Sequence, residues 1–379
     1  MNYKNAYSLC INKIYLNTNY LSQEEYAMTI HTFEVTARVT NETYYKIQAD
    51  LKSNDLSKWE ATPNGMHYWG LSHKGIFITM YTVKKKDFYT YYILYRISAL
   101  RVIENDNFVG LFNTDNYSEL EEAVNTILKE KSAYLPLLKK CKLKRLDFCV
   151  NAEFENHKQV KAYIKTVKRA NIPSKLDLYM EYDKTSKRTK PTRNDFTVEA
   201  PDYVSVSIYN KYAEMKQQKS GVFPKSEIER SKNIVRIEIR CKKEKIAVLK
   251  KKYNIETISE FMKFGDQIGD YLYNYYLGKI FNNGGIYTLK EALKRIDMSE
   301  YRNKVINFLK DFLRDCNTSR SVADTLKTYK KLYGKEKAKK IIEQLDNIET
   351  SFVTVTAKDE KIFNNHIPTP LELYKEFVE

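Results

Sequence analysis

Glycine and proline are scarce in this sequence, with eleven glycines and eight prolines among 379 residues. Hydrophobic residues make up 42% of the chain, whereas disordered chains are poor in hydrophobic residues and often rich in proline. The composition therefore excludes a largely disordered chain and indicates a folded protein. We expect two or more domains, because single hydrophobic cores stop growing at about 250–300 residues.

Long apolar runs are also missing. The sequence contains no stretch of about 18 consecutive apolar residues, which is roughly what a membrane-spanning helix needs. Its first residues (MNYKNAYSLCINKIY) lack the apolar segment of a signal peptide. We therefore expect a cytoplasmic protein that does not contact a membrane.

Cysteine and histidine number five each, and their spacing excludes the common metal motifs. The cysteines form no Cys-x-x-Cys pair, so we expect neither a structural zinc site nor a disulfide framework. The histidines form no His-x-His or His-Glu-x-x-His pattern that would bring two imidazoles to one metal. A histidine-rich catalytic centre is therefore not expected.

Positive charge, in contrast, is abundant. Lysine and arginine number 64 against 48 aspartates and glutamates, which gives a formal net charge of +16. Such an excess favours a polyanionic partner such as nucleic acid. Basic residues concentrate at 139–145, 184–193, 242–252 and 327–340, although any one of these segments can also be an ordinary solvated surface. The 31 tyrosines are unusual too, but an A·T-rich coding bias would produce the same excess of tyrosine and lysine.

Strand and helix patterns divide the chain into two parts. Strand-like alternation occurs at residues 29–40, 75–83, 88–98, 143–154, 176–182, 202–212 and 233–241. Helices are predicted after a capping box at Ser118 and Glu121 and around residues 160–167. This order predicts an α+β fold with a mainly antiparallel sheet.

The predicted domains follow from the same patterns. Residues 1–250 form the α+β part, with its central motifs in residues 142–245, and helical periodicity predicts a separate helical domain over 251–350. Residues 351–379 are a C-terminal tail. For the helical domain, a plain helical bundle and a winged-helix or helix-turn-helix arrangement that binds duplex DNA are both open.

Three of the predicted strands carry polar residues on one face. Side chains alternate between the two faces of a strand, so each strand can be sorted into an apolar and a polar set. The polar sets of RLDFCVN, VSVSIYNK and IVRIEIRC should lie together on one face of the sheet. They comprise Asp147, Tyr209, Lys211, Arg236, Glu238 and Arg240. One explanation is a solvated face whose carboxylates neutralise neighbouring arginines.

The alternative is a metal-assisted phosphoryl-transfer centre. Two carboxylates, Asp147 and Glu238, can hold Mg²⁺ or Mn²⁺, which prefer oxygen ligands. The Tyr209 hydroxyl can attack a phosphodiester and keep the bond energy as a 5′-phosphotyrosine. Lys211 can lower the pKa of the phenol or balance charge in the transition state. Such a centre cuts a strand and reseals it.

The three blocks KRLDFCVN, SVSIYNK and VRIEIRCKKE also carry a family resemblance. In order and spacing they resemble the R-[IL]-D, [IV]-Y-[ND]-K and R-[IV]-E-[IL] motifs of rolling-circle replication initiators of Gram-positive plasmids. Replication-initiation factors of filamentous phages and integrative elements look similar. The resemblance covers roughly residues 142–245 and implies that Tyr209 is the nucleophile, Asp147 and Glu238 are metal ligands and Lys211 is an auxiliary cation.

Two details qualify these assignments. The sequence lacks the His-hydrophobe-His triplet of other relaxases, so a metal would be held mainly by carboxylates, with one dispersed histidine as a further candidate ligand. Tyr212 follows Tyr209 by three residues. Strand parity places it on the opposite face, and the family motif selects Tyr209.

The resemblance implies a replication initiator that nicks and religates one strand at the origin of a plasmid, phage or integrative element. Its partner is then origin DNA, single-stranded and duplex, with a host helicase and a second copy of the chain as further candidates. We expect the DNA contacts to come from Lys184, Lys187, Arg188, Lys190, Arg193, Arg236 and Arg240. A conjugative relaxase with the same chemistry and a non-enzymatic DNA-binding regulator are the alternatives.

Overall fold

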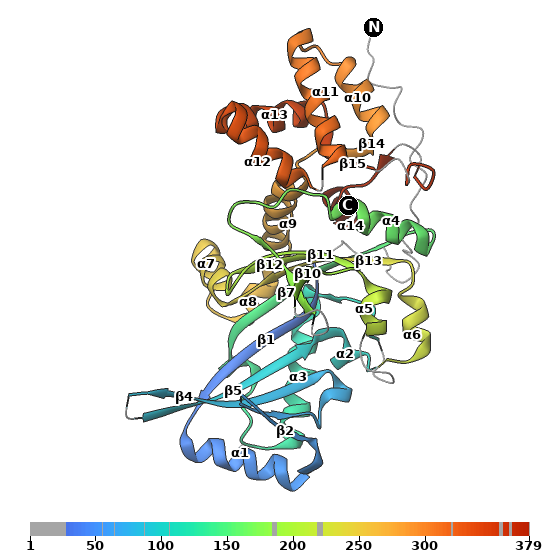
Figure 1. The fold of residues 1–379 in the computed structure, drawn as a ribbon. Coiled ribbons are helices and arrows are strands. Elements are labelled where there is room, and N and C mark those ends of the chain that lie inside the picture. The colour runs from blue at the N-terminus through green and yellow to red at the C-terminus, as the bar shows by residue number, and fades with distance from the viewer. Residues whose placement is uncertain are drawn as a thin grey trace.

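The structure is a computed structural model. It describes residues 28–378 except residues 55, 64, 87, 106, 184–187, 218–222, 320, 356–358 and 364–365. Two residues of the predicted DNA-binding loop, Lys184 and Lys187, therefore lie outside the described residues. Figure 1 shows a central sheet with a mainly helical C-terminal part at one end and α1 (Asn41–Asn54) at the other.

Within the described residues, the main sheet has eleven strands in the order β2-β3-β4-β5-β1-β7-β13-β12-β11-β8, with β6 paired to β1. All of its pairings are antiparallel. The strands are β1 (Thr29–Val39), β2 (Trp59–Thr62), β3 (Gly65–Tyr68), β4 (Ile76–Lys85), β5 (Phe88–Ser98), β6 (Phe112–Asn113), β7 (Lys142–Glu153), β8 (Asp177–Leu178), β11 (Asp195–Ala200), β12 (Val204–Asn210) and β13 (Ile234–Cys241). The expected α+β fold with an antiparallel sheet is confirmed.

One predicted strand ends earlier than expected. The pattern at residues 202–212 predicts a continuous strand, but β12 ends at Asn210 and α5 (Lys211–Gln217) begins immediately after it. The side chain of Asn210 explains the change, because its Oδ1 accepts the N–H of Ala213 at 3.1 Å and so satisfies a donor in the first turn of the helix. Lys211 is therefore a helix residue.

Other local differences have similar causes. The predicted strand at 176–182 is divided into β8 and β9 (Met180–Asp183), and β9 forms a separate hairpin with β10 (Arg188–Pro191) inside the basic loop. Helix α3 (Tyr117–Lys131) begins one residue before Ser118, so that serine is not its N-cap. The preceding turn is instead capped by Asn113, whose side chain accepts the N–H of Asp115.

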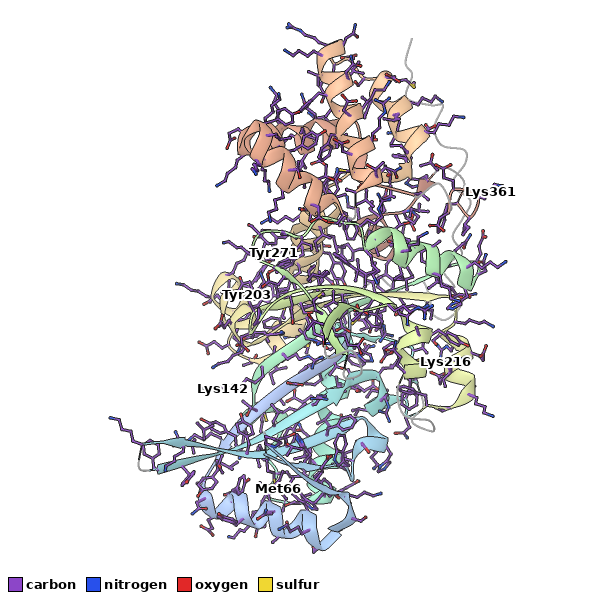
Figure 2. All side chains as sticks on the ribbon, in the orientation of Figure 1. Met66, Lys142, Tyr203, Lys216, Tyr271 and Lys361 are labelled. Carbon is purple, nitrogen blue, oxygen red and sulfur yellow. The ribbon has the colours of Figure 1, made fainter. Side chains whose placement is uncertain are left out.

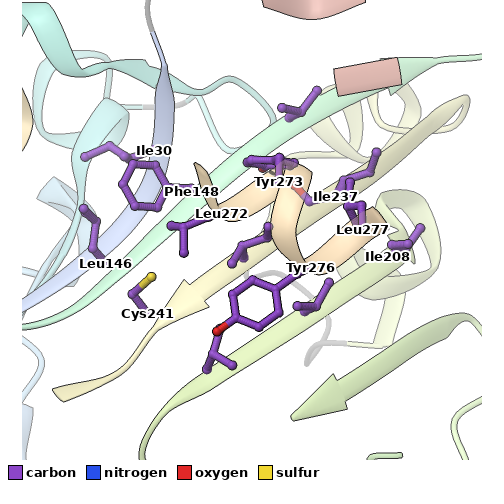
Figure 3. Close-up of a cluster of buried hydrophobic side chains, with 14 of the residues drawn as sticks. Ile30, Leu146, Phe148, Ile208, Ile237, Cys241, Leu272, Tyr273, Tyr276 and Leu277 are labelled. Atoms are coloured by element: carbon purple, nitrogen blue, oxygen red, sulfur yellow. Dashed lines mark hydrogen bonds between the residues drawn. The ribbon is translucent and has the colours of Figure 1, made fainter. Parts of the chain in front are cut away.

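The apolar face of the central strands is covered by α4 (His157–Val167) and α9 (Gly265–Phe281). The hydroxyl of Tyr273 on α9 donates to the carbonyl of Ile237 on β13 at 3.2 Å. Figure 3 shows this packing among Ile30, Leu146, Phe148, Ile208, Cys241, Leu272, Tyr276 and Leu277. Helix α9 begins after residue 250, yet it packs on the sheet. The predicted domain boundary at residue 250 therefore separates the sheet from a helix that covers it.

The opposite face of the central strands carries the polar residues. Four parts of the chain approach it: α2 (Ala99–Ile103), the segment around Val109 between α2 and β6, α5, and α6 (Lys225–Arg230). The side chain of Asn151 on β7 donates to the carbonyl of Val109 in that segment at 2.8 Å. This cover leaves β13 buried on both faces, so the explanation of a fully solvated polar face is wrong.

The C-terminal part is not purely helical. Its helices are α7 (Lys243–Tyr253), α8 (Ile258–Lys263), α10 (Leu289–Asp297), α11 (Asn303–Thr318), α12 (Val322–Tyr333), α13 (Lys335–Asn347) and α14 (Pro370–Val378). They are joined by a small sheet, which helical periodicity did not predict, of β15 (Thr350–Val355), β14 (Gly285–Thr288) and β16 (His366–Ile367). The chain end returns to α9, where Tyr374 stacks on Tyr273 with ring centroids 4.2 Å apart.

None of the helices in the described part of the chain is both long enough and apolar enough to cross a bilayer.

Candidate active site

Adjacent strands bring the predicted polar residues together. Strands β7, β13 and β12 are neighbours, and their register pairs Asp147 with Arg240 and Tyr209 with Arg236. Ser207 pairs with Glu238, so Glu238 lies one polar-face position from Tyr209. The alternation of side chains then places all of these polar groups on one face, as the sequence predicts.

Tyr209 lies in a pocket of about 250 Å³ on this face. Its Oη donates to Glu238 Oε2 at 3.3 Å. Besides these two residues, the pocket is lined by Asn194, Asp195, Thr197, Ser207, Asn210, Glu214, Gln217 and Arg240. Burial raises the pKa of Tyr209 well above its ordinary value, the Glu238 charge adds to this rise, and Arg236 opposes it. The phenol is therefore protonated in the free protein and needs a base before it can attack.

Two arginines hold the carboxylates. Arg145 donates from Nε to Asp147 Oδ1 at 2.8 Å and from Nη2 to Asp147 Oδ2. Arg240 bridges the two acids, with Nε 3.3 Å from Asp147 Oδ1 and Nη2 2.7 Å from Glu238 Oε1. Arg145 also reaches Glu34 on β1 at 3.1 Å. The predicted neutralisation of the acids by arginine is therefore observed, but it occurs in a buried network.

Burial affects the two acids differently. Burial and the Glu238 charge raise the pKa of Asp147, against the effect of Arg240 and Arg145. Burial acts in the same direction on Glu238, but Arg240, Arg145 and Arg236 together outweigh it and lower its pKa. Glu238 is therefore ionised at neutral pH, and its carboxylate accepts the hydrogen bond from the Tyr209 hydroxyl.

Arg236 is fully buried, with 0% of its surface exposed. Its Nε donates to Asn151 Oδ1 at 2.8 Å, and its Nη2 donates to the carbonyl of Val109. In this position it cannot reach a DNA phosphate, which corrects its place among the expected DNA contacts. Within the described residues its Nη1 has no hydrogen-bond partner. Its positive charge acts on Tyr209 from inside the protein.

Lys211 also differs from expectation. Its Nζ donates to Glu214 Oε2 at 2.8 Å, and the side chain is almost fully buried. Burial and then Arg236 lower the pKa of Lys211, while Glu214 and Glu238 raise it. Its direct partner is thus Glu214, a residue that strand parity could not identify because Glu214 lies on the helix that replaces the predicted strand.

His31 on β1 was not assigned to the site from the sequence. Burial lowers its pKa well below the ordinary value, and the charges of Arg236, Lys211, Arg145 and Arg240 lower it further. A neutral imidazole therefore lies among the site's cations. The sequence leaves one dispersed histidine open as a ligand, and the pairing of β1 with β7 that brings His31 near these cations depends on the tertiary fold.

The donor set does not fit a divalent metal as it is arranged. Both oxygens of Asp147 and one oxygen of Glu238 are held by guanidinium groups. Among the described residues, no group of three or more His, Cys, Asp and Glu side chains is placed to hold a metal ion. For Asp147 and Glu238 to hold one ion through the oxygens that now bind arginine, Arg145 or Arg240 would have to release them.

The remaining predicted residues are dispersed. Arg240 opens into the pocket with 34% of its side chain exposed, and Arg193 is exposed on the basic loop. Arg188 and Lys190 lie on β10. Tyr212 lies on α5. Its ring packs edge to face against His157 with centroids 5.1 Å apart, and Lys216 Nζ lies 4.4 Å from the centroid of the Tyr212 ring. Figure 2 shows Lys216 on the side of the molecule opposite Tyr203.

Comparisons with known proteins are sparse. No protein-family model matches the sequence, and no curated protein matches it. A solved rolling circle replication initiator protein from Geobacillus stearothermophilus is similar at 12% sequence identity and a TM-score of 0.31. The match covers 67% of this chain and 85% of that one. A likeness at this level does not establish a shared function.

Proposed function

We propose that this protein nicks and rejoins one DNA strand to initiate rolling-circle replication, with Tyr209 as the nucleophile. The observation that carries the proposal is the Tyr209 hydroxyl, which lies in a pocket and donates at 3.3 Å to the buried Glu238. The order of the three sequence motifs and the net charge of +16 also support it.

The proposed steps involve DNA, water and the residues of the pocket. Tyr209 Oη attacks the phosphorus of a phosphodiester while Glu238 accepts the phenolic proton. The bond between phosphorus and the 3′-oxygen breaks, and the leaving oxygen takes a proton from water. The products are a 5′-phosphotyrosine and a free 3′-hydroxyl. Attack by a 3′-hydroxyl on the phosphotyrosine reverses these steps and reseals the strand.

Arginines supply the electrostatic part of the proposal. Arg240 is the exposed cation of the pocket and is assigned to the phosphate oxygens, where negative charge develops in the transition state. Arg236 stabilises the phenolate form of Tyr209 from the buried side, because its charge lowers the pKa of that phenol. Arg145 acts indirectly by holding Asp147, which in turn holds Arg240.

A requirement for Mg²⁺ or Mn²⁺ is a separate proposal. Asp147 and Glu238 are ligands of the right chemical type, but both are bound to arginine, so no step above passes through an ion. Nicking assays with EDTA, followed by addition of Mg²⁺ or Mn²⁺, measure the requirement directly.

The function is tested with supercoiled DNA that carries the replicon encoding this chain. We expect relaxed circles and a DNA adduct that survives detergent, and peptide mass spectrometry should locate the adduct on Tyr209. Specific binding of this DNA without relaxation or adduct in any metal condition would contradict the proposal and favour a DNA-binding regulator.

A further inference from the structure

Lys245 on α7 is a buried lysine surrounded by tyrosine rings. Only 2% of its surface is exposed. Its Nζ lies 5.0 Å from the ring centroid of Tyr271, 5.2 Å from Tyr276, 5.3 Å from Tyr203 and 5.8 Å from Tyr275. Three of these tyrosines are on α9, and Tyr203 directly precedes β12.

Two exposed lysines extend this cluster. Lys252 Nζ lies 3.3 Å from the ring centroid of Tyr271, and Lys279 Nζ lies 3.7 Å from that of Tyr275. Tyr275 itself is 39% exposed. Figure 2 shows Tyr203 and Tyr271 on the same side of the molecule as Lys142. We call the seven residues the tyrosine–lysine surface: Tyr203, Tyr271, Tyr275, Tyr276, Lys245, Lys252 and Lys279.

The lysines of this surface lie next to tyrosine rings and not next to carboxylates. Within the described residues, Lys245, Lys252 and Lys279 form no ion pair with an acidic side chain. Burial lowers the pKa of Lys245, and the charges of Lys252 and Lys279 lower it further. Like charges are thus held together, and a polyanion would relieve their repulsion.

More lysines adjoin the surface. Two of the basic segments seen in the sequence, at 139–145 and 242–252, meet where the start of β7 packs against α7. Burial lowers the pKa of Lys144 and of Lys250. The charge of Lys243 lowers the pKa of Lys144 further, and the charge of Lys142 does the same for Lys250. The positive potential therefore continues beyond the seven residues, although Glu244 on α7 is an exposed acid nearby.

We propose that the tyrosine–lysine surface binds single-stranded nucleic acid, with Lys252 and Lys279 contacting phosphates and the rings of Tyr271 and Tyr275 stacking on bases. Single-stranded binding surfaces combine a basic groove with aromatic stacking platforms. In a duplex the bases are already stacked on one another, so rings placed between lysines favour the single strand.

The surface is separate from the pocket of Tyr209. Tyr203 precedes Tyr209 by six residues along β12, which corresponds to roughly 20 Å of strand. Arg240 on β13 and Lys242, which directly follows that strand, form ion pairs on the polar face, whereas α9, which carries Tyr271, Tyr275 and Tyr276, covers the apolar face. Binding at the surface does not depend on nicking.

The test measures the affinity of the full chain for an oligothymidylate of about 16 nucleotides. We expect Tyr275→Ala to weaken binding by about 5- to 100-fold, whereas Tyr275→Phe, which keeps the ring, should bind within about twofold of wild type because stacking uses the ring face. Tyr134→Ala is the matched control. Tyr134 is an equally exposed ring near Lys46, but Lys46 is paired with Glu42.

Salt dependence gives a second, independent measurement. Lys279→Gln should flatten the slope of log affinity against log salt by about 0.7 for single-stranded DNA. An unchanged slope, or equal loss of affinity in the Tyr275→Ala and Tyr134→Ala variants, would overturn the proposal. Equal weakening of duplex binding by Tyr275→Ala would overturn its restriction to single strands. Because no cleavage is needed, these results stand whether or not nicking is found.

Discussion

Two regions of the molecule differ in the partners of their positively charged side chains. In the pocket of Tyr209, Arg145 and Arg240 are bound to the buried Asp147 and Glu238. In the tyrosine–lysine surface, Lys252 and Lys279 lie over aromatic rings. A buried charge without a partner is costly, so the arginines need their carboxylates. Lys252 and Lys279 are exposed and remain hydrated, so no acid has to neutralise them, while the buried Lys245 is surrounded by tyrosine rings.

The difference predicts a division of work. A network in which every acid is held by an arginine fixes the positions of the reacting groups but offers little net charge to a distant polyanion. A surface without paired acids attracts phosphates but fixes no reacting atom. Substitutions in the pocket should therefore change chemistry and folding stability, whereas substitutions in the surface should change affinity.

Tyr209→Phe should abolish nicking and adduct formation. The change removes only the hydroxyl that attacks phosphorus, while DNA affinity should stay close to wild type because the lysines are intact. Relaxation of supercoiled DNA and adduct formation on denaturing gels measure the loss.

Tyr212→Phe is the matched control, since Tyr212 lies on α5 against His157. Its nicking should equal that of wild type. Loss of nicking in Tyr212→Phe with retention in Tyr209→Phe would identify Tyr212 as the nucleophile and refute the assignment made here.

Glu238→Gln should reduce the rate of cleavage by about 10²- to 10⁴-fold, which is the usual contribution of a general base. Glutamine keeps the shape of the side chain but cannot take the proton of Tyr209. Single-turnover cleavage at saturating DNA separates this loss from any change in affinity. Glu199→Gln is the control, because Glu199 forms a partly exposed ion pair with Lys242 at 3.0 Å. Equal rates for the two variants would remove Glu238 from the reaction.

Strand periodicity predicts which residues of the central strands share the polar face. Asp147, Glu238 and Tyr209 each lie inside a clearly alternating strand, so parity alone assigns them to one face. Lys211 was placed less well, because the cap formed by Asn210 starts a helix that alternation does not reveal. The sequence signal for that change is Asn210, a residue type favoured at helix N-caps, together with Glu214 four residues later in the first turn of the helix.

Other features depend on which elements are neighbours in space. His31 comes near the site's cations only because β1 pairs with β7, and Arg236 is buried only because the segment around Val109 covers its strand. The tyrosine–lysine surface needs α7 and α9 to lie side by side. No local pattern gives these contacts, so the sequence could identify basic segments and abundant tyrosine but not their combination.

Asp147→Asn should lower the free energy of unfolding by about 1–3 kcal/mol, because Arg145 and Arg240 lose the buried carboxylate that they share and keep only Glu34 and Glu238 as acidic partners. Lys279→Gln should change it by less than about 0.5 kcal/mol, as expected for a surface position. Urea unfolding followed by circular dichroism compares the two. Similar losses of stability in both variants would break the contrast between a paired pocket and an unpaired surface.

The pH dependence of cleavage should be the smallest effect, a change of less than about twofold between pH 6 and 9 at saturating DNA. Burial acts to raise the pKa of Glu238, but the neighbouring arginines outweigh it and hold that pKa below its ordinary 4.5, so Glu238 stays ionised over this range and loses its proton-accepting form only as the pH falls through its lowered pKa. Burial keeps the pKa of Tyr209 well above 10, so the phenol stays protonated until Glu238 accepts the proton. His31 stays neutral, because burial lowers its pKa well below 6.5. Single-turnover rates across this range provide the measurement. A rate that rises about tenfold per pH unit would show that hydroxide from the solvent, and not Glu238, removes the proton.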